Sequence, residues 1–114
     1  MSQILVDKMR RARQSSVTVG SITLTVRRPT DLEMLDMRGA KLLQSDILKK
    51  FVDDWSGVTE LDLIPGGTPT PVPFSKELFA EWVADHPESW TAISTAVVDG
   101  YKKHEEELAL SIKN

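Results

Sequence analysis

Residues 16–28 contain the pattern that most restricts the fold, because they predict a β-hairpin with one apolar face. Aliphatic and threonine side chains alternate on both sides of Gly20 and Ser21. A Gly-X pair at this place is the signal of a two-residue type II′ turn. Pairing Val19 with Ile22 puts every aliphatic side chain of the hairpin on one face. An isolated hairpin is unstable in water, so this face must pack against helices or another strand.

A helix is predicted directly after the hairpin. Pro29 ends the second strand, and Thr30 with Glu33 forms a capping box in which each residue bonds the backbone N–H of the other. An apolar stripe is expected along this helix. It would contain Leu32, Leu35, Leu42 and Leu43, with Gly39 on the same side.

The apolar spacing continues from Ile47 to Trp55, which predicts helix as far as Trp55 and an end at residues 56–57. Two arrangements fit this pattern. Either one helix covers the whole stretch, or residues 45–46 cap a second helix. We favour a break or kink near residues 44–45.

A connector rich in glycine and proline occupies residues 56–74. The apolar run at 61–64 is too short to assign. Pro65 and the two glycines after it predict a turn, and the prolines at 69–73 force extended backbone. This proline segment is either a stiff linker between helices or a polyproline II ligand for a partner, and we favour the linker.

Two further helices are predicted after the connector. Ser75 caps the first, which runs to about Ala84, and Phe74 with Phe79 fits a hydrophobic staple. Its expected buried face contains Leu78, Phe79, Trp82 and Val83. Asp85 or His86 caps the second, with Pro87 in its first turn. Its apolar stripe contains Trp90, Ile93, Val97, Tyr101, His104, Leu108 and Ile112.

Together these elements predict an α+β fold, mostly helical, with one N-terminal β-hairpin packed on three to four helices. At 114 residues, one domain is the natural count. Residues 1–15 precede the hairpin as a basic arm, in which 3–14 have the spacing of a short helix. Residues 30–114 form the helical part.

Composition restricts the setting in which the chain works. The sequence contains no cysteine, so neither a disulfide framework nor a thiolate metal site is expected. No apolar run approaches the roughly 20 residues of a membrane span, and the N-terminus lacks the apolar core of a signal peptide. We therefore expect a cytoplasmic protein with no membrane contact.

The charges are divided unequally along the chain. Residues 1–29 hold six basic side chains and one acidic side chain, whereas the remainder holds eight basic and sixteen acidic ones. A basic arm on an acidic body indicates a solvated helix face, an acidic partner, nucleic-acid contact or self-association of unlike ends. We favour the solvated face. The acidic body opposes binding to phosphates, which counts against nucleic-acid contact.

Catalytic patterns are absent from the sequence. Residues 53–54 are adjacent acids, which diverge on a helix and form no acid/base pair. His86 and His104 lie at a helix start and on an apolar stripe, where capping and packing explain them. The sequence thus predicts a protein that is not an enzyme and has no catalytic residue, cofactor or metal site.

Four short motifs resemble those of phage tail assembly chaperones, a family encoded by long-tailed, lambda-like phages and prophages. They are RPTD at 28–31, WSGV at 55–58, PVPFSKE at 71–77 and the PE helix start at 87–88. The similar pattern begins near residue 17 and does not include the arm. The resemblance implies a non-enzymatic protein of the host cytoplasm. Such a protein binds the long, helix-rich tape measure protein and helps to recruit the tail tube protein.

Two other functions remain as alternatives: a structural head–tail connector or tail-completion protein, and a small nucleic-acid-binding regulator. A chaperone for a helix-rich client should offer an apolar groove. The hypothetical client-binding residues are Trp55, Phe74, Phe79, Trp82 and Trp90. The alternative is that these rings simply fill the core.

Overall fold

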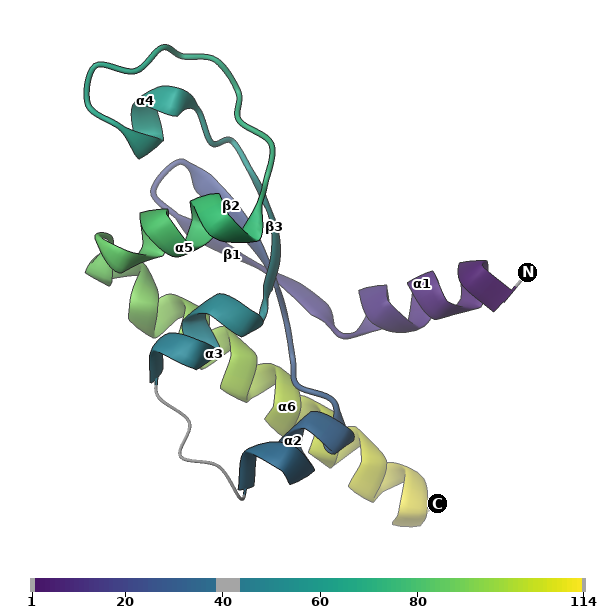
Figure 1. The fold of residues 1–114 in the computed structure, drawn as a ribbon. Coiled ribbons are helices and arrows are strands. Elements are labelled where there is room, and N and C mark those ends of the chain that lie inside the picture. The colour runs from purple at the N-terminus through teal and green to yellow at the C-terminus, as the bar shows by residue number, and fades with distance from the viewer. Residues whose placement is uncertain (1, 39–43, 114) are drawn as a thin grey trace.

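The computed structural model describes residues 2–38 and 44–113. A three-stranded antiparallel sheet, in the order β1-β2-β3, packs against helices (Figure 1). The elements are α1 (Ser2–Ala12), β1 (Gln14–Val19), β2 (Ile22–Arg27), α2 (Asp31–Arg38), α3 (Gln44–Lys50), β3 (Val52–Ser56), α4 (Glu60–Leu63), α5 (Lys76–Ala84), the 3₁₀ turn η1 (Pro87–Ser89) and α6 (Trp90–Lys113). The α+β, mostly helical fold is therefore confirmed, and the sheet has one strand more than expected.

The hairpin has the predicted register. Val19 pairs with Ile22 and Val17 with Leu24. Gly20 has a φ of 60°, whereas Ser21 does not have a positive φ, as a type II′ turn requires. The aliphatic side chains of β2 are buried, so the alternation in the sequence specifies the face that meets the core.

The third strand corrects the predicted helix from Ile47 to Trp55. Helix α3 ends at Lys50, and β3 pairs with β2. Leu24 lies opposite Trp55 and Val26 opposite Val52, so the register shifts by one residue between them. This β-bulge lets two residues three apart face the same side. The i, i+3 spacing of Val52 and Trp55 therefore results from a bulged strand and not from a helical turn.

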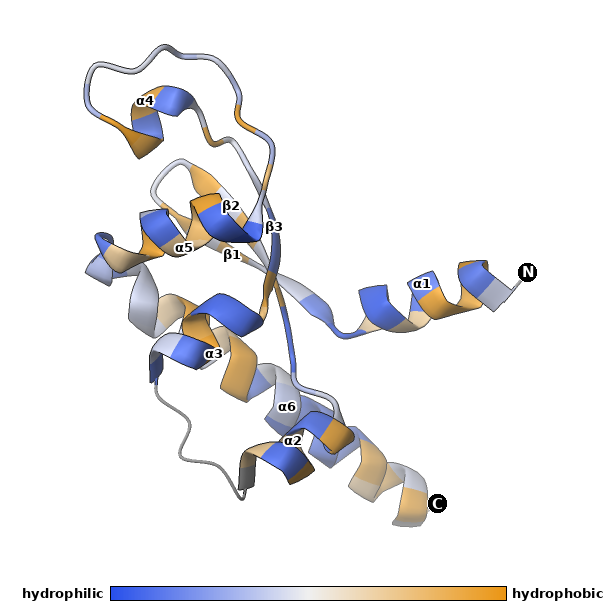
Figure 2. Ribbon diagram, in the orientation of Figure 1, coloured by the Kyte–Doolittle hydropathy of each residue, from blue (hydrophilic) through white to orange (hydrophobic). Residues whose placement is uncertain are grey.

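The core lies on one face of the sheet, where α3, α5 and α6 cover it. Figure 2 shows that hydrophobic segments occur in each of these helices and in the strands. The buried core residues are Ile22, Leu24, Val26, Leu48, Phe51, Val52, Trp55, Val58, Phe79, Trp82, Val83, Ile93 and Val97.

Helix α2 begins with the predicted capping box, and the described leucines of its apolar stripe are exposed. The Thr30 N–H donates to Glu33 Oε1 at 3.0 Å, and the Glu33 N–H donates to Thr30 Oγ1 at 3.1 Å. Leu32 and Leu35, from the predicted apolar stripe, are 69% and 64% exposed. The rest of that stripe lies at 39–43, outside the described residues. Helix α3 begins at Gln44, where a break or kink was expected, but the stretch that joins it to α2 is not described.

The two ends of the chain extend beyond the core. Helix α1 has no buried residue and projects away from the sheet (Figure 1). The first half of α6 buries Ile93 and Val97, but Leu108 and Ile112 are 51% and 80% exposed. The predicted stripe of α6 is therefore buried only near its start. No helix in the described ranges is long and apolar enough to cross a membrane.

Candidate partner-binding groove

The loop that contains α4 is closed by backbone hydrogen bonds. The Glu60 N–H donates to Thr70 O at 3.0 Å, and the Val72 N–H donates to Val58 O at 2.9 Å. Gly67 lies against the helix, since a Cβ atom there would be 2.7 Å from Glu60 O. The proline-rich segment at 69–73 therefore runs back beside residues 58–60. The prediction of a stiff linker did not include this contact.

Trp55 holds the end of this loop against the sheet. Its Nε1 donates to Val72 O at 2.8 Å, and its ring meets Phe74 edge to face with centroids 5.4 Å apart. The ring centroids of Phe74 and Phe79 lie 6.0 Å apart, and this contact is the predicted hydrophobic staple. Ser75 then caps α5 by accepting from the Leu78 N–H at 3.0 Å, also as predicted.

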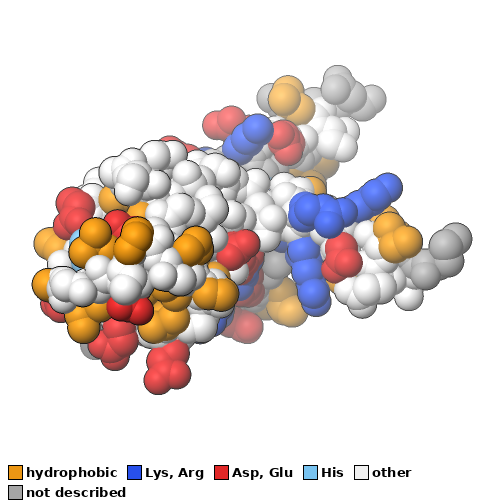
Figure 3. All heavy atoms as spheres, turned by 90° about the horizontal axis from the view of Figure 1, so that it is seen from above, with side chains coloured by type: hydrophobic (Ala, Val, Ile, Leu, Met, Phe, Trp, Pro, Cys, Tyr) orange, Lys and Arg blue, Asp and Glu red, His pale blue; other side chains and the backbone are white. Residues whose placement is uncertain are grey.

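A groove of about 640 Å³ lies between α4, the returning loop and α5. Its apolar lining consists of Leu63, Ile64, Val72, Leu78 and Trp82. Ile64 is 56% exposed and Leu78 39% exposed, so the expected burial of Leu78 is wrong. Figure 3 shows this end of the molecule from above, with hydrophobic side chains open to solvent.

Acidic side chains surround the apolar lining. Glu60, Glu81 and Asp85 belong to the groove, and all three are exposed. His86 closes one end, where its ring stacks on Trp82 with centroids 4.5 Å apart and its Nδ1 lies 2.7 Å from Trp82 O. Helix α6 follows this corner through η1, with His86 as the N-cap residue and Pro87 in the first turn. The groove therefore suits an apolar segment that also carries basic residues.

Four of the five hypothetical client-binding residues lie together. Successive ring contacts join Trp55, Phe74, Phe79 and Trp82. Trp90 lies outside this chain of rings and donates from Nε1 to Val83 O at 2.6 Å.

Burial separates these five rings into two groups. Trp55, Phe79 and Trp82 are buried, whereas Phe74 and Trp90 are partly exposed. Of the five, Trp82 alone lines the groove, so the others support its floor or lie beside it. Client contact stays a prediction, now for Trp82 and its aliphatic neighbours.

The aliphatic lining of the groove was not recognised in the sequence. Leu63 and Ile64 belong to the run at 61–64 that was too short to assign. Helix α4 is a single turn that ends at Leu63, and Ile64 is its C-cap residue. A signal was present, because Thr59 precedes this run and Asp62 lies three residues later. The Asp62 carboxylate accepts from the Thr59 N–H at 2.8 Å.

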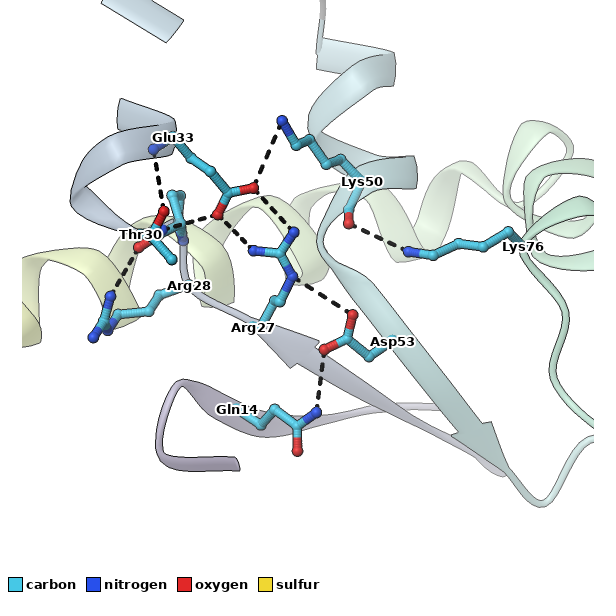
Figure 4. A network of polar contacts seen from close by, with 9 residues as sticks. Gln14, Arg27, Arg28, Thr30, Glu33, Lys50, Asp53 and Lys76 are labelled. Atoms are coloured by element: carbon cyan, nitrogen blue, oxygen red, sulfur yellow. Dashed lines mark hydrogen bonds and ion pairs between the residues drawn. The ribbon is translucent and has the colours of Figure 1, made fainter. Parts of the chain in front are cut away.

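A second candidate site is a charged pocket of about 540 Å³ at the base of α1, near the contacts drawn in Figure 4. Arg10, Arg13 and Arg27 line it. The Arg27 guanidinium donates to both oxygens of Glu33, at 2.8 and 3.1 Å, and its Nε lies 3.6 Å from Asp53. The charge of Arg27 is thus matched within the chain, which makes this cluster structural.

Glu33 is the centre of the charged cluster. Burial opposes ionisation of its carboxyl group, but hydrogen bonds from Arg27 and the Thr30 N–H outweigh burial and lower the pKa to about 2. Lys50 Nζ also lies 3.6 Å from this carboxylate. The cluster ties β2, α2 and the end of α3 together.

The two histidines have structural contacts. His104 Nε2 lies 3.2 Å from Asp31 Oδ2, and Tyr101 donates to Asp31 Oδ1 at 2.8 Å. The bond from Tyr101, followed by the contact with His104, holds the pKa of Asp31 below its usual value. Within residues 2–38 and 44–113, no three His, Cys, Asp or Glu side chains come together as a metal site would require.

A smaller apolar hollow of about 320 Å³ lies between α2, α3 and α6. Met34, Met37, Ile47, Val97 and Tyr101 contribute to its lining, with Lys102 and Glu105 at its edge. Its edge carries both charge signs, and its volume is half that of the groove beside α5. The groove beside α5 is the stronger candidate for binding a partner.

Comparison with known proteins gives no relative for this chain. No protein-family model matches it, and neither a curated protein nor a solved structure shows significant similarity.

Proposed function

We propose that this chain is a phage tail assembly chaperone whose groove binds helical segments of the tape measure protein. The observation that carries the proposal is the exposed apolar groove beside α5, to which the PVPFSKE segment that resembles the family contributes Val72. Val72 and Leu78 line it, while Phe74 and Ser75 fix the start of α5 behind it. An amphipathic helix presents a matching stripe of apolar residues.

The rest of the proposed role follows from the family resemblance. The protein acts in the host cytoplasm without catalysis, and helps to recruit tail tube protein around the bound tape measure protein. Its acidic groove favours client segments in which lysine or arginine flanks the apolar stripe.

The experiment is co-expression with the tape measure protein, the very long helical protein encoded just downstream in such gene clusters. We expect the two proteins to purify together and the tape measure protein to stay soluble. A tape measure protein that aggregates equally with and without this chain contradicts the proposal.

A head–tail connector or tail-completion protein is the second candidate. The exposed apolar residues of α1, α2 and α6 favour it, since a subunit of the particle needs several permanent contacts. Mass spectrometry of purified particles separates the two functions. A chaperone is absent from the finished particle, whereas a structural subunit is present.

A further inference from the structure

Helix α1 is an amphipathic helix that buries none of its residues against the described part of its own chain. Ile4 and Leu5 are each 60% exposed and Met9 is 52% exposed, and helical geometry places all three on one side. Lys8 and Arg11 lie within or beside this apolar face. The helix therefore presents an apolar stripe flanked by positive charge.

The groove beside α5 has the complementary surface. Its lining is aliphatic and aromatic, and Glu60, Glu81 and Asp85 supply negative charge around it. Figure 3 shows Lys and Arg side chains gathered on the side of the molecule where α1 projects, and acidic side chains among hydrophobic ones on the opposite side.

Helix α1 cannot reach the groove of its own chain. Trp82 and His86 line both the groove and a small hollow at the hairpin turn, so the groove lies beside Gly20. The helix leaves from the other end of β1, where the Arg28 N–H donates to Arg13 O at 3.0 Å. Six residues of strand span about 20 Å, whereas eleven residues of helix span about 16 Å. Even if α1 folded back along β1, it would therefore be too short to reach the groove.

We propose that α1 of one copy binds the groove beside α5 of a second copy. In this arrangement Ile4, Leu5 and Met9 cover the apolar lining, and Lys8 and Arg11 approach Glu81 and Asp85. Because each copy contributes its helix to one neighbour and its groove to another, the contact is head-to-tail and generates open chains or rings. The proposal does not depend on the identity of any client, since it concerns the isolated protein.

The test is sedimentation velocity of the purified full chain, whose monomer mass is 12.7 kDa. We expect species larger than the monomer that dissociate on dilution and on addition of salt, which screens exposed charges. The first variant carries Lys8→Glu with Arg11→Glu, and the second carries Glu81→Lys with Asp85→Lys. Each should raise the dissociation constant about tenfold or more, because like charges then face each other.

Mixing the two variants gives the decisive result. The second variant keeps the wild-type α1, which can bind the wild-type groove of the first variant. The first variant has an acidic α1, which matches the basic groove of the second variant. The mixture should therefore associate although neither variant does so alone. The matched control is Lys102→Glu with Lys103→Glu on α6, which changes the charge equally and should leave association intact.

Three results would overturn the proposal. The first is a wild-type chain that stays monomeric up to about 1 mM, a concentration at which weak association would be detected. The others are variants that associate as the wild type does, and a mixture of the two variants that stays monomeric. Leu5→Glu provides an independent helix variant at an exposed position and should also prevent association. Circular dichroism of each variant establishes that the fold is retained.

Discussion

The Nζ atom of Lys76 lies 2.7 Å from the carbonyl oxygen of Val52. The same ammonium group is 3.3 Å from Lys50 O and 3.5 Å from Lys49 O, the last carbonyls of α3. The start of α5 thus caps the end of α3 and marks the point where the chain changes from helix to strand. Positive charge is favourable at a helix C-terminus, and burial lowers the pKa of Lys76.

Replacing Lys76 with Met should therefore destabilise the fold by about 1 kcal/mol, because hydrogen bonds from a charged donor are lost. Urea denaturation of the variant and the wild type measures this difference. Lys102→Met, at an exposed position of α6, is the control and should change the free energy of unfolding by less than about 0.5 kcal/mol. Equal values for the two variants would show that Lys76 does not stabilise the junction.

The hairpin face can be tested by a pair of substitutions. Leu24 is fully buried, so Leu24→Ala should lower the free energy of unfolding by about 2–4 kcal/mol through the cavity it leaves. Thr18 is exposed on the other face, and Thr18→Ala should change the free energy by less than about 1 kcal/mol. Similar midpoints in urea for the two variants are incompatible with the observed register.

Two glycines with positive φ should respond differently to alanine. Gly20 has a φ of 60° with open space around it, whereas Gly57 has a φ of 76° and a Cβ atom there would be 2.9 Å from Ser21 O. Gly20→Ala should destabilise by about 1–2 kcal/mol from the left-handed backbone alone. Gly57→Ala should destabilise more, because the strand end must also move away from the hairpin turn. Thermal melts compare the two variants, and a smaller effect at Gly57 would contradict this contact.

Glu33 should make stability depend on pH in the acid range. Its folded pKa of about 2 is below the ordinary value of 4.5, so the contribution of its carboxylate is fully present above 4.5. That contribution is lost as the pH falls from 4.5 toward 2. For a partly exposed pair we expect on the order of 1 kcal/mol.

Glu33→Gln isolates this contribution, because the amide cannot ionise. The difference in unfolding free energy between wild type and Glu33→Gln, measured in urea at several pH values, should shrink as the pH falls through this window. A difference that is the same at pH 7 and near pH 2 would rule out the ion pair with Arg27 as its source.

Local signals in the sequence predicted most of the elements. The hairpin register, the capping box at Thr30, the Ser75 cap and the staple between Phe74 and Phe79 all depend on residues close in sequence. Their geometry follows from backbone hydrogen bonding and side-chain alternation within a few residues.

The errors arose where distant contacts decide the structure. Val52 and Trp55 have helical spacing, but pairing with β2 through a bulge places them on one face of a sheet. The lining of the groove was missed for a related reason. Leu63 and Leu78 lie in different elements, and the return of the proline-rich segment past Val58 brings these elements together. Neither the pairing of β3 with β2 nor the approach of α4 to α5 can be predicted from the hydrophobic periodicity of one sequence.

The measurement that tests the central claim most directly is the affinity of Ile64→Glu for the tape measure protein. Ile64 lines the groove and is 56% exposed, so a carboxylate there should spare the fold while disrupting the apolar surface. Leu108→Glu is the matched control, since Leu108 is 51% exposed on α6 and outside the groove. Titration calorimetry should show binding by Ile64→Glu weakened about tenfold or more, equivalent to about 1.4 kcal/mol. The control should bind as the wild type does, with both melting temperatures unchanged. Equal affinities for Ile64→Glu and the wild type would contradict the account.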